Sequence, residues 1–505
     1  LDNAGEPIIA LLPKVSWQVY FNPNKNFSTL LKNNKDKTAT YRVIKTYRDK
    51  QSSITTNMSY ADWQDELIAY SNNHYKADDY KEKLVDSINL TNNKPNYQHG
   101  LIGFIGYDIA AYELSSAANI PQAMQPSAVL GHYDIYLSLS KEVSKKGADG
   151  KIYWQLNTQL SETSHCTAKL LTMLGNYLKS LDNDLNNKLI NPLHPEPLNL
   201  TAKWHKSDYE QAFAQTQRYL QQGDCYQINL TQTWQGELTP SVNYDDKPST
   251  TLNLIDYLPT LQRNTQAPFA GYMSISQPNN KSDNPNFELL SCSPELFFTF
   301  KKDAEKGGHY ITTKPIKGTM PRGSTITVDE AFKQQLINSD KDRSENLMIV
   351  DLLRNDLGKY AKIGTVKVPQ LFVIESFSNV HHMVSTITAE LKTNTHPLKV
   401  LFGSLPAGSI TGTPKKRAVE IIAELEAELR GAYCGTMGYM NFDGSGQWNV
   451  LIRTLQATKL EDGSKQVSLW AGGGITVASE CDAEYQECLD KVGNLLAVLA
   501  QAENR

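Results

Sequence analysis

Residues 313–323 read TKPIKGTMPRG and place one lysine, Lys317, on a predicted tight turn. The preceding residues 310–313 predict a strand, because β-branched and aromatic side chains favour extended backbone. Proline and glycine on either side of Lys317 hold its amine at a defined position. A lysine held in this way becomes a nucleophile when desolvation or a neighbouring cation lowers its pKa toward neutrality. The pattern alone also fits a solvated lysine in a turn, since lysine is mostly exposed in proteins.

The composition limits the classes of function. A chain of 505 residues exceeds the usual size of one domain, so two subregions are expected. Fifty Lys and Arg against 54 Asp and Glu give a net charge of −4, which offers no electrostatic reason to bind nucleic acid or an anionic membrane. No apolar run approaches the roughly 18 residues that span a bilayer, and the first residues do not read as a signal peptide. We therefore expect a cytoplasmic protein that acts on a small molecule or a protein.

The six cysteines are scattered, without a CxxC pair, which predicts reduced thiols rather than a disulfide framework. Cys434 is a conceivable nucleophile. The flanking Tyr433 and Met437 indicate a buried strand instead, and free cysteine is among the most buried residue types. We interpret Cys434 as a packing residue.

A linker is predicted at residues 181–200, which are polar and contain Pro192, Pro195 and Pro197. It divides the chain into an N-terminal region, residues 1–197, and a second region, residues 198–505. A helix is predicted over residues 207–222, with Ser207 and Glu210 as a capping box.

Antiparallel strands are predicted over residues 433–440, 448–458 and 465–470. The segments between them, NFDGSG at 441–446 and EDGS at 461–464, contain the Asp-Gly pairs that are typical of hairpin turns. The framework is therefore predicted to be an antiparallel β-structure to which helices are added, an α+β protein.

The last predicted helix presents two stripes. Glu484, Glu487 and Lys491 recur at spacings of three and four, and a separate apolar stripe contains Leu489, Val492, Leu496 and Leu499. The polar stripe also fits a solvated face with an ordinary Glu–Lys pair worth about 0.2–0.5 kcal/mol. However, the helix follows Gly472, Gly473 and Gly474, a run that lets backbone approach a ligand closely.

Glu345 opens another predicted helix, whose buried face is formed by Leu347, Val350, Leu353 and Leu357. Asp351 and Asp356 are interpreted as structural, pairing with Arg354 or capping the end of the helix.

Two further motifs indicate recognition of a ligand. GSITGTPK at residues 408–415 is not a phosphate loop, because Gly412 is followed by Thr-Pro-Lys and not by Gly-Lys-Ser or Gly-Lys-Thr. Arg453, on a predicted strand, can offer a planar fork to a carboxylate. His382 alone also fits a buried structural histidine, and His381 is interpreted as structural.

Separate motifs follow one another along the chain: GDCYQINL (223–230), SPELF (293–297), PIKGT (315–319), RSENLMIVDLLRNDLG (343–358), VHHMVS (380–385), GSITGTPK (408–415), IRT (452–454), AGGGIT (471–476) and AEYQECLDK (483–491). This ordered set resembles the chorismate-utilising enzymes, and within them the component I subunits of aminodeoxychorismate synthase, whose turn carries PIKGT. Component I of anthranilate synthase typically has PIAGT there. The resemblance covers roughly residues 201–500 and implies the fold of that family, antiparallel sheets forming a sandwich flanked by helices. For the first 200 residues it is implied only by the length of the chain.

The resemblance also implies roles for individual residues. It makes Glu345 and Glu487 ligands of Mg²⁺ with Glu484 close by, Lys317 a nucleophile and Glu295 a general acid. Substrate contacts are implied for a larger set, which contains Gln227, His382, Thr411, Gly412, Tyr433, Arg453, Gly472, Gly473, Gly474 and Lys491.

The implied reaction is Mg²⁺-dependent amination of chorismate with ammonia to 4-amino-4-deoxychorismate, through a covalent adduct of Lys317. Gln227 disfavours addition of water at C2, because the resembling position of isochorismate and salicylate synthases carries a lysine as general base and a neutral amide cannot take a proton. Two alternatives stay open: component I of anthranilate synthase, and a non-catalytic subunit that binds chorismate or tryptophan. Hydrolysis of glutamine takes an activated nucleophile that we do not find here, so we expect a separate glutamine amidotransferase partner.

Overall fold

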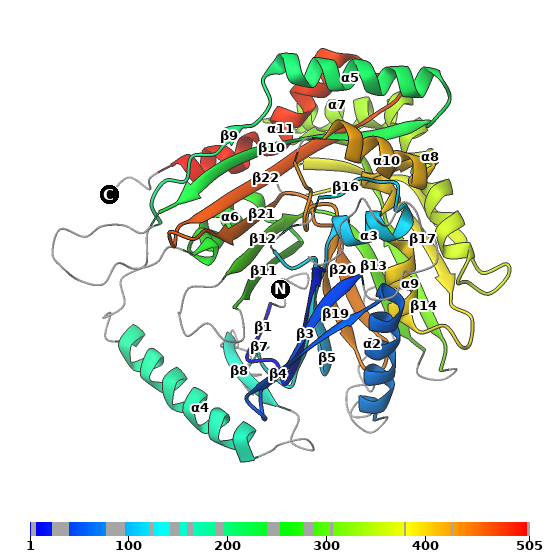
Figure 1. The fold of residues 1–505 in the computed structure, drawn as a ribbon. Coiled ribbons are helices and arrows are strands. Elements are labelled where there is room, and N and C mark those ends of the chain that lie inside the picture. The colour runs from blue at the N-terminus through cyan, green and yellow to red at the C-terminus, as the bar shows by residue number, and fades with distance from the viewer. Residues whose placement is uncertain are drawn as a thin grey trace.

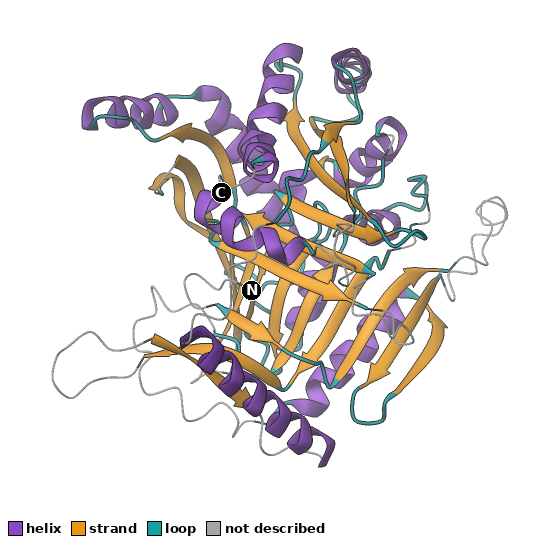
Figure 2. Ribbon diagram, turned by 90° about the vertical axis from the view of Figure 1, so that its left-hand side faces the viewer, coloured by secondary structure: helices purple, strands orange, loops and turns teal. Residues whose placement is uncertain are grey.

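The structure is a computed structural model that describes residues 1, 7–22, 40–76, 96–121, 123, 125–141, 152–158, 165–186, 195–239, 253–276, 286–303, 307–377, 380–426 and 428–501. Its strands form three sheets, and every strand pair runs antiparallel. Helices cover the sheets in the upper half of the molecule (Figures 1 and 2). The predicted α+β class with antiparallel sheets is confirmed.

The largest sheet has the strand order β15-β17-β14-β13-β20-β19-β5-β6-β2-β3-β4, and β16 pairs with β17 beside this path. Its strands are β2 (Val15–Phe21), β3 (Tyr41–Tyr47), β4 (Ser52–Met58), β5 (Gly100–Ile105), β6 (Ala128–Tyr133), β13 (Leu296–Lys302), β14 (His309–Lys314), β15 (Ile316–Pro321), β16 (Lys367–Ser376), β17 (Val380–Glu390), β19 (Thr436–Asn441) and β20 (Gly446–Asn449).

The second sheet has the order β11-β12-β21-β22-β10-β18, with β9 paired to β10, and the third has the order β1-β7-β8. Their strands are β1 (Ile8–Ala10), β7 (Ile135–Lys141), β8 (Ile152–Thr158), β9 (Thr201–Ala202), β10 (Gln227–Leu238), β11 (Phe269–Ile275), β12 (Phe287–Ser293), β18 (Gly412–Thr413), β21 (Thr454–Lys459) and β22 (Lys465–Ile475). One contiguous buried core contains side chains of both large sheets, among them Phe298, Trp448, Leu455 and Leu469, as expected for a sandwich.

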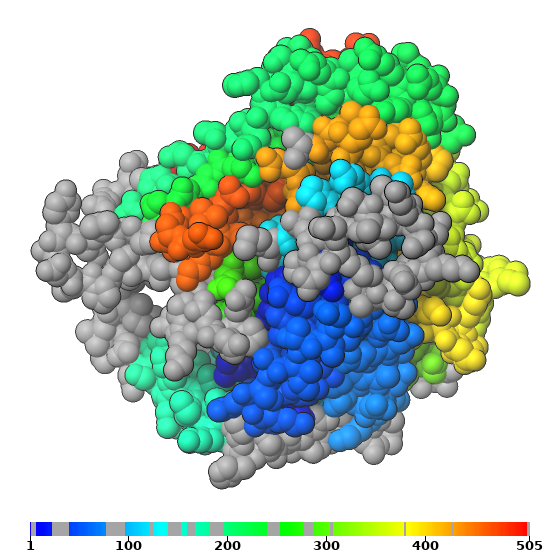
Figure 3. All heavy atoms as spheres, in the orientation of Figure 1, coloured from blue at the N-terminus to red at the C-terminus, as the bar shows by residue number. Residues whose placement is uncertain are grey.

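The helices and 3-10 turns are α2 (Tyr60–His74), α3 (Tyr107–Leu114), α4 (His165–Asn186), α5 (Lys206–Gln221), η3 (Leu254–Tyr257), α6 (Leu258–Thr265), α7 (Ile326–Ile337), α8 (Asp340–Gly358), α9 (Pro397–Ser404), η4 (Gly408–Ile410), α10 (Lys415–Leu425) and α11 (Cys481–Ala500). Figure 3 shows α5 (green) above, the N-terminal strands (blue) below, and the orange segment of β22 and α10 between them on one face. Among the described residues, no helix is long and apolar enough to cross a membrane.

The largest sheet joins the two regions of the chain. Strand β5 of the N-terminal region pairs with β19 along its whole length, from Gly100 opposite Asn441 to Ile105 opposite Thr436. The boundary near residue 198 stays a prediction. The prediction of an irregular linker from residue 181 onward is wrong at its start, because the first residues of that stretch continue α4 to Asn186. Leucines that recur at three- and four-residue spacing extend the amphipathic pattern past the point where Asp and Asn begin.

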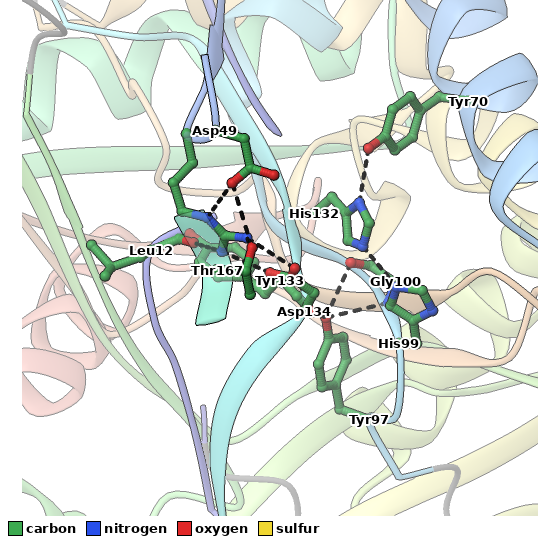
Figure 4. Close-up of polar contacts among 11 residues, drawn as sticks. Leu12, Asp49, Tyr70, Tyr97, His99, Gly100, His132, Tyr133, Asp134 and Thr167 are labelled. Atoms are coloured by element: carbon green, nitrogen blue, oxygen red, sulfur yellow. Dashed lines mark hydrogen bonds and ion pairs between the residues drawn. The ribbon is translucent and has the colours of Figure 1, made fainter. Parts of the chain in front are cut away.

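Polar contacts tie the N-terminal strands together (Figure 4). The guanidinium of Arg48 donates to both carboxylate oxygens of Asp134, at 2.8 and 2.9 Å, and to Thr167 Oγ1 at the start of α4. Beside them, His132 Nε2 lies 2.7 Å from His99 Nε2, and its Nδ1 lies 2.8 Å from the hydroxyl of Tyr70 on α2. Burial lowers the pKa of His132 well below its ordinary value, and the neighbouring imidazoles of His99 and His74 add to the effect. The buried imidazole is therefore held neutral.

Local predictions were right about turns and wrong about several boundaries. Both Asp-Gly hairpins are confirmed, between β19 and β20 and between β21 and β22. The predicted strand over residues 448–458 is two strands that lie in different sheets. Helix α5 begins one residue earlier than predicted, because the backbone N–H of His205 donates to Asp208 at 2.8 Å and the cap forms there rather than at Ser207.

Candidate active site

A cavity of about 610 Å³ is lined by residues of both large sheets and of helices α8 and α11. Most of the predicted site residues line it, namely Glu295, Lys317, Glu345, His382, Tyr433, Arg453, Gly472, Gly474, Glu487 and Lys491. They come from segments that are up to about 200 residues apart in the chain, and the order of the strands brings them together.

Lys317 lies on a strand bulge and not on the predicted tight turn. Strands β14 and β15 pair in succession with β17 and separate at Pro315. The register of β15 against β17 shifts between Ile316 and Thr319, where Gly318 has φ +79°. A Cβ on Gly318 would lie 2.7 Å from Leu336 and 2.8 Å from Asp342, so glycine is required there. The bulge directs Lys317 into the cavity, where its Nζ lies 3.5 Å from Glu345 Oε2.

Glu295 lies in the connection between β12 and β13 and is buried against the cavity. Its Oε1 accepts a hydrogen bond from Ser409 Oγ at 3.1 Å. Burial raises the pKa of Glu295 to about 7, although the charge of Lys317, the Ser409 hydrogen bond and the charge of Lys491 oppose the rise. A carboxyl group with this pKa exists in both protonation states near neutral pH, which suits a general acid.

Three carboxylates and three lysines form ion pairs in and beside the cavity. Each carboxylate pairs with one ammonium group: Glu345 with Lys317 at 3.5 Å, Glu484 with Lys341 at 3.1 Å, and Glu487 with Lys491 at 2.6 Å. Glu345 lies in the second turn of α8 and does not open that helix as predicted, because Ser339 caps the helix six residues earlier.

The carboxylates influence one another. Burial raises the pKa of Glu345, the charges of Lys317 and Lys341 oppose this rise, and the charges of Glu484 and Glu487 add to it. Burial acts to raise the pKa of Glu487 as well, but the charge and hydrogen bond of Lys491, together with the charges of Lys317 and Lys341, outweigh it, so the pKa lies below its ordinary value. A bound cation would relieve the mutual repulsion of these groups.

The residues present fit a divalent cation. A Cβ placed on Gly473 would lie 3.0 Å from Glu484 Oε2 and 3.8 Å from Glu487 Oε1, so oxygens of both side chains meet beside this glycine. Within the described ranges, no group of three or more His, Cys, Asp and Glu side chains is arranged as a metal site. Mg²⁺ usually takes one or two protein carboxylates and fills its octahedron with water and substrate oxygens, so this set suits it.

Arg453 lies between β20 and β21 and not on a strand as predicted. The chain leaves one large sheet and enters the other here, and Arg453 has φ +51°. Its side chain lines the cavity, and its guanidinium has no ion pair with the described residues. A largely buried cation without a carboxylate partner favours an anionic ligand.

His382 lines the cavity and His381 does not. His382 Nδ1 lies 2.8 Å from Thr319 Oγ1, and burial lowers the pKa of His382 to about 4, with help from Arg453 and His381. The imidazole is therefore neutral at physiological pH and acts through hydrogen bonds. His381 is buried away from the cavity and contacts Ser376 and Asp329, as its structural interpretation predicts.

The sequence of the chain matches a known family. The family model of chorismate binding enzymes matches residues 39–497. The chain belongs to the chorismate-binding enzymes. Aminodeoxychorismate synthase component 1 of Salmonella typhimurium (strain LT2) is 36% identical over 411 residues, which are 79% of this chain and 76% of the relative. The protein of the same name from Escherichia coli (strain K12) is 41% identical over 60% of this chain and 61% of its own. The prediction of a chorismate-utilising enzyme is confirmed.

Solved structures show the same fold. Anthranilate synthase component I from Streptococcus pneumoniae TIGR4 matches with a TM-score of 0.66 and 22% identity, over 97% of this chain and 92% of that one. The menaquinone-specific isochorismate synthase from Escherichia coli matches with a TM-score of 0.56 and 16% identity, over 99% and 96% of the two chains. Both structural matches include the N-terminal region, in which we recognised no sequence motif of the family.

Some predicted residues of this chorismate-binding enzyme lie behind the cavity lining. Gln227 is fully buried, and its amide nitrogen lies 2.3 Å from a Cβ built on Gly474, with Lys317 Nζ 3.4 Å from the same point. Thr411 is buried and donates to Ala407 O at 2.8 Å. Gly412, with φ +142°, packs on the backbone of β10. Gly473 and Glu484 lie beside Glu487, as described above.

Other residues of the cavity were not predicted: Asn229, Thr319, Lys341, Ser409, Trp470 and Asp490. Asn229, Thr319, Ser409 and Asp490 fall inside motifs quoted from the sequence, close to the residues that were chosen from them. The sequence around Lys341 gives no indication that this residue belongs to the site, because its partner Glu484 lies 143 residues further along the chain.

The aspartates on α8 have structural partners, as predicted, although only Asp351 pairs with Arg354. Arg354 donates to Asp351 at 2.7 Å, and Asp356 is buried between Lys359 and Lys415, at 3.0 and 2.8 Å. On the same helix, Val350, Leu353 and Leu357 are buried as predicted, whereas Leu347 is 47% exposed. Cys434 is buried, and burial raises the pKa of its thiol to about 12, which fits a packing residue.

Proposed function

We propose that this chain aminates chorismate with ammonia to 4-amino-4-deoxychorismate, through a covalent adduct of Lys317. The observation that carries the proposal is the position of the Lys317 amine in the cavity, between Glu345 on one side and Gln227 and Gly474 on the other. Relatives named aminodeoxychorismate synthase component 1 support it.

The substrate has two carboxylates, and the cavity offers them separate partners. Arg453 presents a guanidinium without a carboxylate partner in the described part of the chain, and His382 lies nearby as a neutral hydrogen-bonding group. Glu345 and Glu487, with Glu484 beside them, would hold Mg²⁺. When bound, this cation would supply a Lewis acid for the ring carboxylate of chorismate.

The protein's own groups carry the proton and the nucleophile. Glu295 donates its proton to the 4-hydroxyl, which leaves as water. Lys317, which must be unprotonated to act as a nucleophile, forms a bond from its nitrogen to C2 as both ring double bonds shift and the C4–O bond breaks. Ammonia then attacks C4, both double bonds shift back, and the bond between C2 and Lys317 breaks. The proton lost by the attacking ammonia returns to the Glu295 carboxylate, so the cycle closes with water as the second product.

Gln227 and Lys317 distinguish the proposed reaction from competing reactions of the family. Gln227 offers a neutral amide, which cannot activate water for addition at C2. Anthranilate synthase component I is the second candidate, since the protein of that name from Synechocystis sp. is 34% identical over 61% of this chain. Lys317 favours the first candidate, because a nucleophile at this position has no role in direct amination of C2. A subunit that only binds its ligand would not need the general acid Glu295 together with the carboxylates of Glu345 and Glu487.

The partner is proposed from the chemistry of the nitrogen source. The name component 1 of the relatives implies a second subunit for them. We infer that a separate glutamine amidotransferase supplies ammonia to this chain, and that both act in the cytoplasm.

Identification of the product tests the proposal. The purified chain, incubated with chorismate, Mg²⁺ and ammonium, should form 4-amino-4-deoxychorismate, detected by liquid chromatography and mass spectrometry. A lyase added afterwards should convert it to 4-aminobenzoate. Formation of anthranilate as the main product would favour the second candidate, and isochorismate would contradict both.

A further inference from the structure

The two oxygens of the Glu295 carboxyl group have different surroundings. Oε1 accepts the hydrogen bond from Ser409 Oγ at 3.1 Å. Oε2 has no hydrogen-bond partner among the described residues, and the side chain lines the cavity. The backbone of Glu295 is held separately, since its N–H bonds to Ser293 Oγ at 3.2 Å and its carbonyl accepts from Val450 N at 3.0 Å. The asymmetry therefore arises at the side chain.

Ser409 is on a turn that the fold holds rigidly. It lies in η4 and is buried. A Cβ on the adjacent Gly408 would lie 2.1 Å from Leu352, so α8 presses directly on the turn. Arg430 donates to the carbonyl of Ile410 at 3.1 Å on the other side. The Ser409 hydroxyl is thus preorganised, and it does not have to be ordered when the substrate binds.

Lys415 secures the entry to the same turn. Its Nζ donates to the carbonyls of Ser404 and Pro406, at 3.1 and 3.3 Å, and pairs with Asp356 at 2.8 Å. The segment that leads into η4 is thereby fixed to α8, which also carries Glu345. One helix consequently sets the positions of both the Glu345 carboxylate and the Ser409 hydroxyl.

We propose that Ser409 is a positioning residue that decides which oxygen of Glu295 carries the acid proton. A hydroxyl that donates to Oε1 favours that oxygen as the unprotonated carbonyl oxygen. The proton then resides on Oε2, on the side of the group that lacks a protein partner and can meet the departing hydroxyl. The inference rests on the proposed function, in which Glu295 is the general acid.

The groups around Glu295 determine how the loss of the Ser409 hydroxyl should change the pKa of Glu295. Lys317 from β15 and Lys491 from α11 stabilise its carboxylate, and the Cys434 thiol is close enough to interact with it electrostatically. The Ser409 hydrogen bond also stabilises the charged form. Removing the hydroxyl should therefore make Glu295 a weaker acid, while the lysines stay in place. A general acid must be protonated, so the loss of activity at high pH should move to higher pH.

The experiment compares Ser409→Ala and Ser409→Thr with a matched control, Ser404→Ala. Ser404 is also buried, but its hydroxyl has no hydrogen-bond partner in the described part of the chain. The rate of amination is measured against pH with the concentration of free NH₃ held constant, because ammonia itself titrates. Thermal unfolding verifies that each variant is folded.

For Ser409→Ala we expect kcat to fall about tenfold, the value of one hydrogen bond to a charged group, with KM changed less than about twofold. The alkaline limb of the kcat profile should move to higher pH. Ser409→Thr should restore the wild-type kcat and the wild-type position of the alkaline limb. Ser404→Ala should match the wild type in both quantities.

An alkaline limb that does not move in Ser409→Ala, or an unchanged kcat, would overturn the proposal. Glu295→Gln separates this failure from failure of the proposed function. If Glu295→Gln abolishes amination while Ser409→Ala behaves as wild type, only the role of Ser409 is wrong. If Glu295→Gln keeps the wild-type pH profile, the general acid itself is wrong, and the role of Ser409 is refuted with it.

Discussion

Replacing Lys317 by alanine tests two consequences of its position at once. The ammonium group lies 3.5 Å from Glu345 Oε2, and the two side chains are only 16% and 13% exposed. At an effective dielectric constant of about 20 this separation corresponds to an attraction of about 5 kcal/mol. Desolvation and side-chain ordering cancel most of it, which leaves a net value of about 1–2 kcal/mol. Any cation that binds Glu345 must compete with this ion pair.

Lys317→Ala should therefore bind Mg²⁺ more tightly than the wild type, by roughly 5–30-fold for a net pair energy of about 1–2 kcal/mol. Titration calorimetry on the metal-free protein measures this without any turnover. In the same variant, formation of 4-amino-4-deoxychorismate should fall by about 10⁴-fold or more, because no nucleophile replaces the lysine. Ammonia can then reach C2 directly, so a small amount of anthranilate is the expected residual product.

Lys314→Ala is the matched control. Lys314 is on the neighbouring strand and pairs with Glu375 at 2.6 Å, outside the cavity lining. This variant should keep the wild-type affinity for Mg²⁺ and the wild-type product. An unchanged rate of 4-amino product in Lys317→Ala would refute the covalent route, and an unchanged affinity for Mg²⁺ would refute the competition at Glu345.

Three further expectations follow from the same structure. Glu345→Gln and Glu487→Gln should each weaken Mg²⁺ binding about 10–100-fold and reduce turnover severely, and full activity in excess chelator would contradict the metal assignment. The isolated chain should use ammonium at alkaline pH but not glutamine, and an added amidotransferase should confer glutamine-dependent activity at neutral pH; robust use of glutamine by the chain alone would disprove the partner. Because the pKa of His132 is lower in the folded than in the unfolded state, its contribution to stability is present above the unfolded value of about 6.5 and is lost as the pH falls below it. Thermal unfolding between pH 7 and pH 5 should show this loss, about 1.4 kcal/mol per pH unit for one proton, and His132→Gln should reduce the slope; an identical slope in that variant would exclude His132 as its source.

The sequence by itself determined the features that depend on neighbours in the chain. Asp-Gly pairs located both hairpins, since these residues adopt the backbone angles of tight turns at low cost. The three- and four-residue spacing of Glu484, Glu487 and Lys491 placed them on one stripe of α11, as a helical repeat requires. The ordered motifs identified the family, because its recognition and catalytic groups occur in short, characteristic strings.

Tertiary structure alone decided which of these groups meet, and in what geometry. Arg453 reaches the cavity because the chain passes from one sheet to the other there, at a backbone angle that no local pattern announced. Lys317 is aimed by a bulge that exists only relative to its partner strand β17. Ser409 meets Glu295 across 114 residues of chain, and Lys341 meets Glu484 across 143. Such contacts depend on the order and register of strands, which periodicity within a single segment does not encode.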